Sequence, residues 1–221
     1  MIRGLESARR GPAQGQAKQV VVFLHGYGAD GNDLLGLANP LEPHMPDTAF
    51  VAPNAPEQCV GNPMGFQWFP IPWLDGSSEE ESARAMQAGV ADLNAYLDQI
   101  LLDEGLSADR MILLGFSQGT MMSLHVAPRR VPAVAGVVGF SGRLLEPESL
   151  AEDVVARPPV LLLHGDQDEM VPPASMPDAA QALAENGFDV ITNVMEGTGH
   201  GIDPNGLSMA LAFMRDKLGL A

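Results

Sequence analysis

Residues 111–120 read MILLGFSQGT, an apolar run that leads directly into a serine flanked by glycines. Within it, GFSQG at 115–119 matches the pattern G-x-S-x-G, and helix-compatible residues follow at 120–127. A strand, a sharp turn and a helix in this order form a nucleophile elbow, which exposes the serine hydroxyl at the apex of a strained turn. The pattern also occurs in ordinary loops, so Ser117 needs support from a base, an orienting acid and an oxyanion hole.

Short apolar runs alternate with helical patterns along the 221 residues. Most runs are continuous rather than alternating, as expected of parallel strands buried on both faces. The predicted strands are 20–24, 49–52, 111–114, 134–140, 160–163 and 190–195, and the predicted helices are 79–104, one after the elbow, one from about 176 to before 187, and 207–218. This alternation predicts one α/β domain over 1–221, with a mostly parallel sheet covered by helices on both faces and a poorly patterned N-terminal segment at 1–18.

Candidate acids and a candidate histidine follow the elbow along the chain. Their order is the one that α/β hydrolases use, which is Ser, then Asp or Glu, then His. The segment HGDQDEMVP at 164–172 follows one predicted strand, and EGTGHG at 196–201 follows the next. Both begin at strand ends, where open parallel sheets place their ligand sites. His200 stands between glycines there and is the predicted general base. Three other histidines are expected to have structural roles. His44 and His125 are expected at the surface or in packing, and His164 is expected to brace its loop.

Three acids compete for the role of orienting the histidine. Asp168 lies within its loop just before a Val-Pro pair and is predicted to turn toward His200. Asp166 is closer to the strand and is expected to bond the backbone of its own loop, as short carboxylates do in turns. Glu169 is expected to be solvated.

The oxyanion hole requires two backbone N–H groups aimed at the developing negative charge. One is predicted from Gln118, the residue after the candidate nucleophile, at the positive end of the following helix. The second is predicted from Tyr27 in HGYG at 25–28, which follows the strand at 20–24. A glycine turn that only leads the chain out of the strand is the alternative for 25–28.

Four segments together resemble the phospholipase/carboxylesterase family, which includes the acyl-protein thioesterases. They are FLHGYGAD at 23–30, GFSQG at 115–119, HG through Asp168 to VP at 164–172, and GH at 199–200. The resemblance extends over about 20–218. It implies a compact α/β hydrolase without a large cap domain, and a metal-independent esterase of carboxylic or thioester acyl groups with no cofactor.

The resemblance also assigns the site. It places the triad on Ser117, Asp168 and His200, and the oxyanion amides on Tyr27 and Gln118. Eukaryotic thioesterases of the family typically have Leu at the position of Tyr27. The bulkier ring here is expected to reshape the pocket entrance.

The segment 53–76 is long, rich in Pro and Gly, and predicted to have no regular structure. A stretch of this kind inside a compact domain is usually functional or disordered, and aromatic residues argue against disorder. It forms either the wall of an apolar substrate pocket or a loop pinned to the domain, and it also fits a lid or a homodimer contact. The aromatic residues concerned are Phe66, Trp68, Phe69 and Trp73.

The composition excludes several classes of partner. A net charge of -16 disfavours nucleic acid and anionic membrane surfaces. The chain has no run of roughly 18 apolar residues for stable membrane insertion, and the polar segment 11–19 lacks the core of a signal peptide. The single cysteine, Cys59, is read as a passive thiol in a loop and suits a reducing cytoplasm. The five histidines show no metal-ligand spacing such as H-E-x-x-H.

The predicted function is a serine carboxylesterase that hydrolyses oxyesters of small or medium acyl groups through an acyl-enzyme. An acyl or acyl-protein thioesterase, or a lysophospholipase, would use the same triad, and the residues do not separate these reactions. A serine peptidase would need more surface for the chain beyond the scissile bond. A non-catalytic binding module would be expected to lack a triad or elbow residue.

Overall fold

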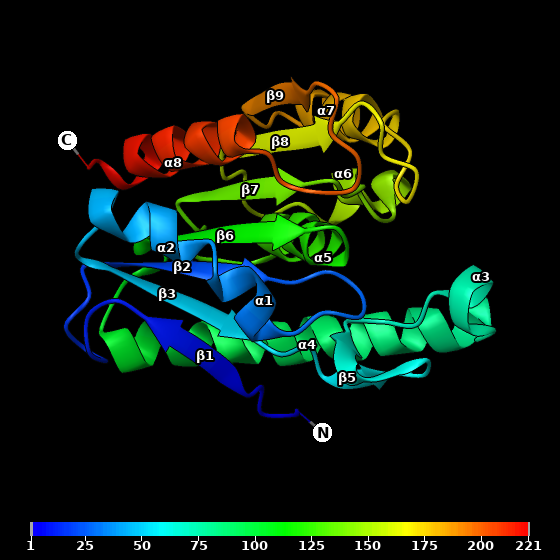
Figure 1. Cartoon of the computed structure of the whole chain (residues 1–221), viewed down its shortest axis with the longest axis horizontal. Coiled ribbons are helices and arrows are strands. Elements are labelled where there is room, and N and C mark those ends of the chain that lie inside the picture. Colours follow the sequence, from blue (N-terminus) through cyan, green and yellow to red (C-terminus); the bar gives the residue numbers. More distant parts are fainter. Residues whose placement is uncertain (1, 221) are drawn as a thin grey trace.

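A seven-stranded sheet forms the centre of the computed structural model, which describes residues 2–220 (Figure 1). The strand order is β1-β3-β2-β6-β7-β8-β9, and only β1 runs antiparallel to its neighbour. The strands are β1 (Ser7–Arg10), β2 (Gln19–Leu24), β3 (Thr48–Pro53), β6 (Met111–Phe116), β7 (Gly136–Phe140), β8 (Val160–Gly165) and β9 (Val190–Met195). The predicted parallel sheet is confirmed.

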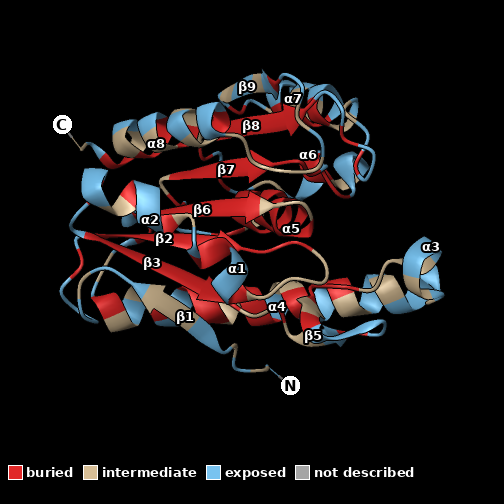
Figure 2. Ribbon diagram, viewed as in Figure 1, coloured by how far each residue is buried: buried red, intermediate tan, exposed pale blue. Residues whose placement is uncertain are grey.

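Helices cover both faces of this sheet (Figures 1 and 2). Alternate side chains of a strand point to opposite faces, so β2 contributes Val20 and Val22 to one core cluster and Val21 and Phe23 to the other. The first cluster includes side chains of α4 (Glu79–Glu104), α5 (Gln118–Val126) and α7 (Ser175–Glu185), and the second those of α1 (Gly31–Leu35), α2 (Ala38–Leu41) and α8 (Pro204–Leu218). Burial on both sides explains why the strands are continuous apolar runs.

The longest helix, α4, has the bounds that the sequence predicts. The Ser78 hydroxyl accepts a hydrogen bond from the Glu81 amide at 3.1 Å, and the Glu81 carboxylate accepts one from the Ser78 amide at 2.8 Å. This capping box satisfies amides that have no partner inside the helix. Gly105 ends the helix with a positive φ of 65°, a conformation that glycine adopts without strain.

Three predictions about secondary structure need correction. Helix α8 begins at Pro204 rather than 207, because the Asp203 carboxylate caps it by accepting the Gly206 amide at 2.6 Å. Strand β7 begins at Gly136 rather than 134. The segment 1–18 contains β1, which has no apolar pattern because it lies at the sheet edge and is held partly by an ion pair of Arg9 with the buried Glu104.

The segment 53–76 has regular structure, contrary to the prediction. A hairpin of β4 (Glu57–Cys59) and β5 (Asn62–Gln67) is followed by the short helix α3 (Pro72–Asp75). Its proline and glycine residues hid the strand pattern. Cys59 therefore ends a strand and is buried, where a loop thiol was predicted. Hairpin and α3 lie along the N-terminal half of α4 (Figure 1).

No helix among residues 2–220 combines the length and apolar character that crossing a membrane would require.

Candidate active site

The chain turns sharply between β6 and α5 at Ser117. Its φ of 54° and ψ of -115° are rare for a residue with a side chain and mark local backbone strain. The turn is held because the Ser117 amide donates to the Phe140 carbonyl at 2.9 Å. A Cβ at Gly119 would overlap the Leu24 carbonyl oxygen, so only glycine lets α5 pack this closely against β2. The strand–turn–helix context predicted for GFSQG is present.

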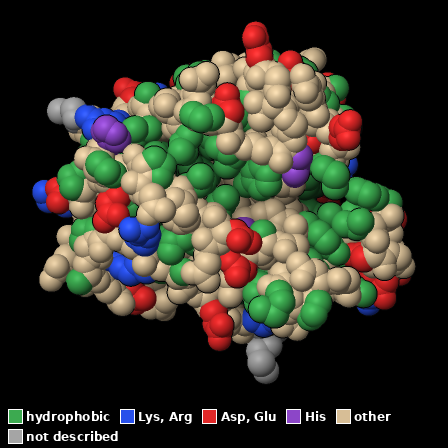
Figure 3. Space-filling model, in the orientation of Figure 1, with side chains coloured by type: hydrophobic (Ala, Val, Ile, Leu, Met, Phe, Trp, Pro, Cys, Tyr) green, Lys and Arg blue, Asp and Glu red, His purple; other side chains and the backbone are tan. Residues whose placement is uncertain are grey.

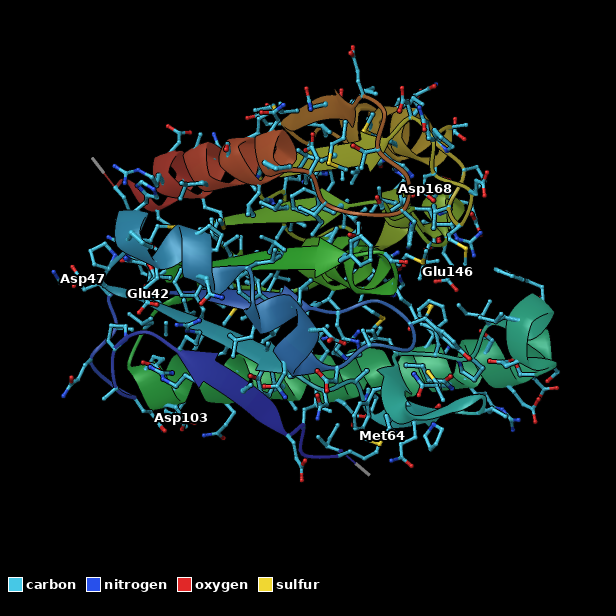
Figure 4. All side chains as sticks on the ribbon, viewed as in Figure 1. Glu42, Asp47, Met64, Asp103, Glu146 and Asp168 are labelled. Atoms are coloured by element: carbon cyan, nitrogen blue, oxygen red, sulfur yellow. The ribbon has the colours of Figure 1, made fainter. Side chains whose placement is uncertain are left out.

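Asp168 and His200 meet above the carboxyl ends of β8 and β9. The His200 Nδ1 lies 2.8 Å from Asp168 Oδ2 and donates to it, which leaves Nε2 available to take a proton. The Asp168 side chain is buried, and its other oxygen accepts the amides of Met170 and Val171, each at 2.9 Å. Burial opposes ionisation, but the hydrogen bonds from His200 and the two amides outweigh it, so the pKa of Asp168 lies below its ordinary value. Figure 4 shows Asp168 in the loop after β8.

The other residues of these two loops position the pair. His164 Nε2 lies 3.0 Å from the Val171 carbonyl, to which it donates, and 3.2 Å from Asp168 Oδ2, so it braces the loop as predicted. Asp166 does not bond its own loop's backbone as expected. Its carboxylate accepts the Gly197 amide at 2.7 Å and ties the two loops together, because the β8 and β9 strands are adjacent.

Ser117 and His200 line one cavity of about 510 Å³, together with Tyr27 and Gln118. The Phe116 ring packs against the imidazole of His200, with ring centroids 4.9 Å apart. The Ser117 hydroxyl forms no hydrogen bond to His200 in the described structure. In catalytic sites this contact is often long until substrate binds.

The loop that carries Tyr27 lies directly against the serine. A Cβ at Gly26 would be 3.2 Å from the Ser117 Cβ, so glycine allows this approach. The loop is held by His25, whose Nδ1 donates to the Gly26 carbonyl at 2.7 Å and whose Nε2 accepts the Ala55 amide at 2.9 Å. Burial lowers the pKa of His25, which suits this neutral ring. Among residues 2–220 the amides of Tyr27 and Gln118 have no backbone acceptor.

The hairpin fixes the oxyanion loop from the other side. The Gly28 amide donates to the Phe66 carbonyl at 2.9 Å, and the Phe66 amide donates to the Ala29 carbonyl at 2.8 Å. The Asn62 side chain donates to the Gly28 carbonyl at 3.0 Å. Phe66 is therefore part of a brace for this loop and not of the cavity wall, where it was predicted.

The side chain of Gln118 anchors the aromatic segment, which the sequence did not indicate. Its Oε1 accepts the Trp68 amide at 2.8 Å, and its Nε2 donates to the Phe69 carbonyl at 2.7 Å. Trp68 is fully buried, and its indole N–H donates to the His25 carbonyl at 3.1 Å. Trp68 thus pins the segment to the domain and does not line the cavity, contrary to the prediction.

Phe69 and Trp73 do line the cavity, together with the residues between them. Trp73 and Leu74 are exposed on α3, and Met170, which also lines the cavity, is exposed in the loop after β8. Hydrophobic side chains accordingly gather over α3 in the space-filling view (Figure 3). Burial, with smaller contributions from Cys59 and Asp75, raises the pKa of Tyr27 to about 12, so its phenol stays protonated at the entrance.

No cluster of three or more His, Cys, Asp or Glu side chains suited to a metal ion occurs within residues 2–220.

The mostly parallel sheet lies between helix layers, with a serine at the turn after its central strand β6 and a carboxylate–histidine pair on the loops after β8 and β9. These features define an α/β hydrolase without an apparent cap domain. The profile of the phospholipase/carboxylesterase family matches residues 11–218. The chain therefore belongs to the phospholipase/carboxylesterase family and is a hydrolase of the carboxylesterase and thioesterase type.

Individual relatives agree with this assignment. The chain is 30% identical over 223 residues to acyl-protein thioesterase 1 of Gibberella zeae, covering 94% of each chain. It is 28% identical over 199 residues to esterase YpfH of Escherichia coli, covering 90% of this chain and 83% of the relative. The crystal structure of esterase PE8 superposes with a TM-score of 0.91 at 38% identity, over 98% of this chain and all of that one.

Proposed function

We propose that the protein is a serine carboxylesterase that hydrolyses oxyesters of small or medium acyl groups through the triad Ser117, His200 and Asp168. The observation that carries the proposal is the 2.8 Å bond between Asp168 and His200 at a cavity that Ser117 also lines. The family match, the strained turn at Ser117 and the similarity to esterases PE8 and YpfH support it.

In the proposed mechanism, Ser117 attacks the ester carbonyl while His200 Nε2 takes the hydroxyl proton. Asp168 holds the imidazole in this tautomer and stabilises the imidazolium that forms. The amides of Tyr27 and Gln118 bind the oxyanion, and each such donor contributes about 3 kcal/mol to lowering the barrier. His200 then protonates the departing alcohol, and water repeats the sequence on the acyl-enzyme.

The cavity bears on the size of the substrate. About 510 Å³ is enough for a small ligand, and cavities of roughly 300–1,000 Å³ are usual for such molecules. Its walls at Phe69, Trp73 and Met121 are apolar, which suits an acyl chain.

A thioesterase is the second candidate, because the Gibberella zeae relative is described as an acyl-protein thioesterase. Oxyesters and thioesters pass through the same tetrahedral intermediate, so the triad serves both. Parallel assays with p-nitrophenyl esters, acyl-CoA and acyl-cysteine substrates separate them. We expect the highest kcat/KM on an oxyester, and a higher value on acyl-cysteine would favour the thioesterase.

The experiment that tests the proposal compares Ser117→Ala with Ser123→Ala. Ser123 is a buried serine on the same helix, whose hydroxyl donates to the Gly119 carbonyl at 2.8 Å, so it serves as a matched control. Removing a catalytic serine lowers kcat on the order of 10⁶-fold. We expect that loss on p-nitrophenyl butanoate for Ser117→Ala alone. Full activity of a folded Ser117→Ala variant would exclude the proposed mechanism.

A further inference from the structure

The loop after β7 places an arginine in the cavity. Strand β7 lies between β6 and β8, whose ends carry Ser117 and Asp168. A Cβ at Gly142 would be 2.9 Å from the Ser117 carbonyl oxygen, so the loop backbone packs against the elbow. The next residue, Arg143, lines the same cavity as Ser117 and His200. Arg143 and the candidate nucleophile are thus exposed to the same cavity.

Arg143 is exposed and forms no hydrogen bond or ion pair with any residue from 2 to 220. This is unusual in a chain with 28 acidic and 12 basic residues, where a carboxylate is seldom far from an arginine. Arg84 also forms no hydrogen bond or ion pair among these residues, but the pKa of its helix neighbour Glu81 is lowered by hydrogen bonds from Ser78 and, to a smaller extent, by the nearby charge of Arg84. The other arginines bond carboxylate, amide or carbonyl oxygens: Arg3, Arg9, Arg10, Arg110, Arg129, Arg130, Arg157 and Arg215.

The charges of the cavity limit what such an arginine could bind. A guanidinium presents a planar fork of N–H donors that matches a carboxylate with two parallel hydrogen bonds. Glu79 also lines the cavity and is the only acidic side chain that does so among the described residues. Glu79 repels a phosphate dianion about twice as strongly as a carboxylate monoanion, so these charges favour a singly charged anion as the partner of Arg143.

We propose that Arg143 binds a carboxylate of the substrate, so that the preferred substrates are esters that carry a second, free carboxylate. This inference rests on the proposed esterase function and adds the substrate class. The carboxylate could belong to the acyl part, as in a half-ester of a dicarboxylic acid, or to the alcohol part, as in an ester of a hydroxy acid. Arg143 provides the same chemistry in both cases.

The test measures kcat and KM on two matched pairs of substrates. Mono-p-nitrophenyl glutarate is compared with p-nitrophenyl pentanoate for the acyl part, and the butanoyl ester of 3-hydroxypropanoate with propyl butanoate for the alcohol part. Butanoyl glycerol phosphate is a third substrate, and it tests whether a phosphate dianion is preferred to a carboxylate. The variants are Arg143→Gln, Arg143→Lys and the control Arg84→Gln, which removes the same charge from an exposed site that does not line this cavity.

The wild-type protein should prefer the carboxylate member of one pair by about tenfold in kcat/KM, the size expected of one partly exposed charged hydrogen-bond pair. Arg143→Gln should abolish that preference through KM and leave the neutral substrate within about twofold, while Arg143→Lys should keep part of it. Arg84→Gln should keep all of it. Added salt should weaken the preference in the wild-type protein, because the interaction is between charges.

Several results would overturn the inference. One is a wild-type protein that shows no preference for the carboxylate substrate in either pair, or that prefers the phosphate dianion. Another is an Arg143→Gln variant that loses activity equally on charged and neutral substrates. The last is an Arg84→Gln variant that loses the carboxylate preference as Arg143→Gln does. If Ser117→Ala abolishes hydrolysis and one of these results appears, only the role of Arg143 fails. If Ser117→Ala retains full activity, the proposed function itself fails.

Discussion

The elbow and the segment 57–76 both contribute residues to the cavity lining and are built in opposite ways. The elbow is a single strained turn between a buried strand and a buried helix, with glycines where backbones touch. The segment 57–76 is a hairpin and a short helix with many exposed side chains, held to the domain by a few buried contacts. The first region carries the candidate nucleophile and one proposed oxyanion amide, and residues 69–74 of the second form part of the cavity wall.

Gln118 joins the two regions. Its backbone is the predicted oxyanion donor, while its side chain fixes the backbone of Trp68 and Phe69. The wall of the cavity is therefore positioned by the residue next to the candidate nucleophile.

Among the predictions that follow, the largest effect is expected from replacing one of the two aspartates in the loop after β8. Asp168→Asn leaves the shape of the loop but favours the wrong tautomer of His200, and should lower kcat about 10⁴-fold. Asp166→Asn weakens only the bond to the Gly197 amide, and should keep activity within about tenfold of wild type, since loop ties usually affect stability more than chemistry. Steady-state assays on p-nitrophenyl butanoate provide the comparison. Equal losses in the two variants would mean that Asp168 has no special role.

Replacing each of the two tryptophans should affect a different property: protein stability for Trp68 and the acyl-length preference for Trp73. Trp68→Ala empties a fully buried site and should cost about 3–5 kcal/mol of unfolding free energy. Trp73 is 73% exposed, so Trp73→Ala should change stability by no more than about 0.5 kcal/mol. Its effect should appear in the dependence of KM on acyl length, because Trp73 lines the cavity. Urea unfolding and an ester series measure the two quantities. A Trp73→Ala variant with unchanged chain-length dependence would remove that residue from the substrate wall.

Gln118→Ala tests how much the side chain of Gln118 contributes to holding the segment 57–76 in place. It keeps the backbone amide but leaves a buried N–H and a buried carbonyl without partners, at a cost of about 1–3 kcal/mol each. Gln58→Ala on the exposed hairpin is the matched control and should be nearly neutral. Proteolysis of the native protein should cut near 57–76 faster in Gln118→Ala. Equal proteolysis rates in both variants would show that other contacts hold the segment.

The smallest effect concerns His125, which lies outside the cavity lining. Burial, and then the cation of Arg129, lower its pKa to about 4. Its Nδ1 has no hydrogen-bond partner, since the Glu146 carboxylate lies 3.9 Å away, too far for a hydrogen bond. Between about pH 6.5 and 4 the unfolded chain binds a proton at this position that the folded chain does not. Stability therefore falls as the pH is lowered through this window.

His125→Leu removes this proton uptake. Relative to wild type, the variant should become more stable as the pH falls from 7 to about 4.5, as measured by urea midpoints. A stability difference that does not change with pH would mean that His125 is not buried as a neutral ring.

The sequence predicted the first region better than the second, for physical reasons. A nucleophile elbow needs small residues at fixed spacing, so its geometry is visible in GFSQG, and strand ends bring 164–172 and 196–201 together once the sheet is parallel. The hairpin of 57–67 has no such constraint. Its Gly65 packs against the Gly28 carbonyl, which depends on a contact across the fold that no local pattern reveals.

Dependence on contacts across the fold also explains the wrong predictions for Phe66, Trp68 and β1. The four aromatic residues Phe66, Trp68, Phe69 and Trp73 lie close together in the sequence. Only the tertiary contacts with His25, Gln118 and Gly28 decide which of them faces the cavity. Short polar strands at an edge, such as β1, likewise depend on their neighbour, β3.

The central claim is that Ser117 is the nucleophile activated by His200 and Asp168, and covalent labelling tests it most directly. The purified protein is treated with a fluorophosphonate, and the modified peptide is located by mass spectrometry. We predict one phosphonyl group per chain on Ser117, labelling that is greatly slowed in His200→Ala, and none in Ser117→Ala. A protein that remains unlabelled, or one labelled on another residue at the same rate in Ser117→Ala, would contradict the claim.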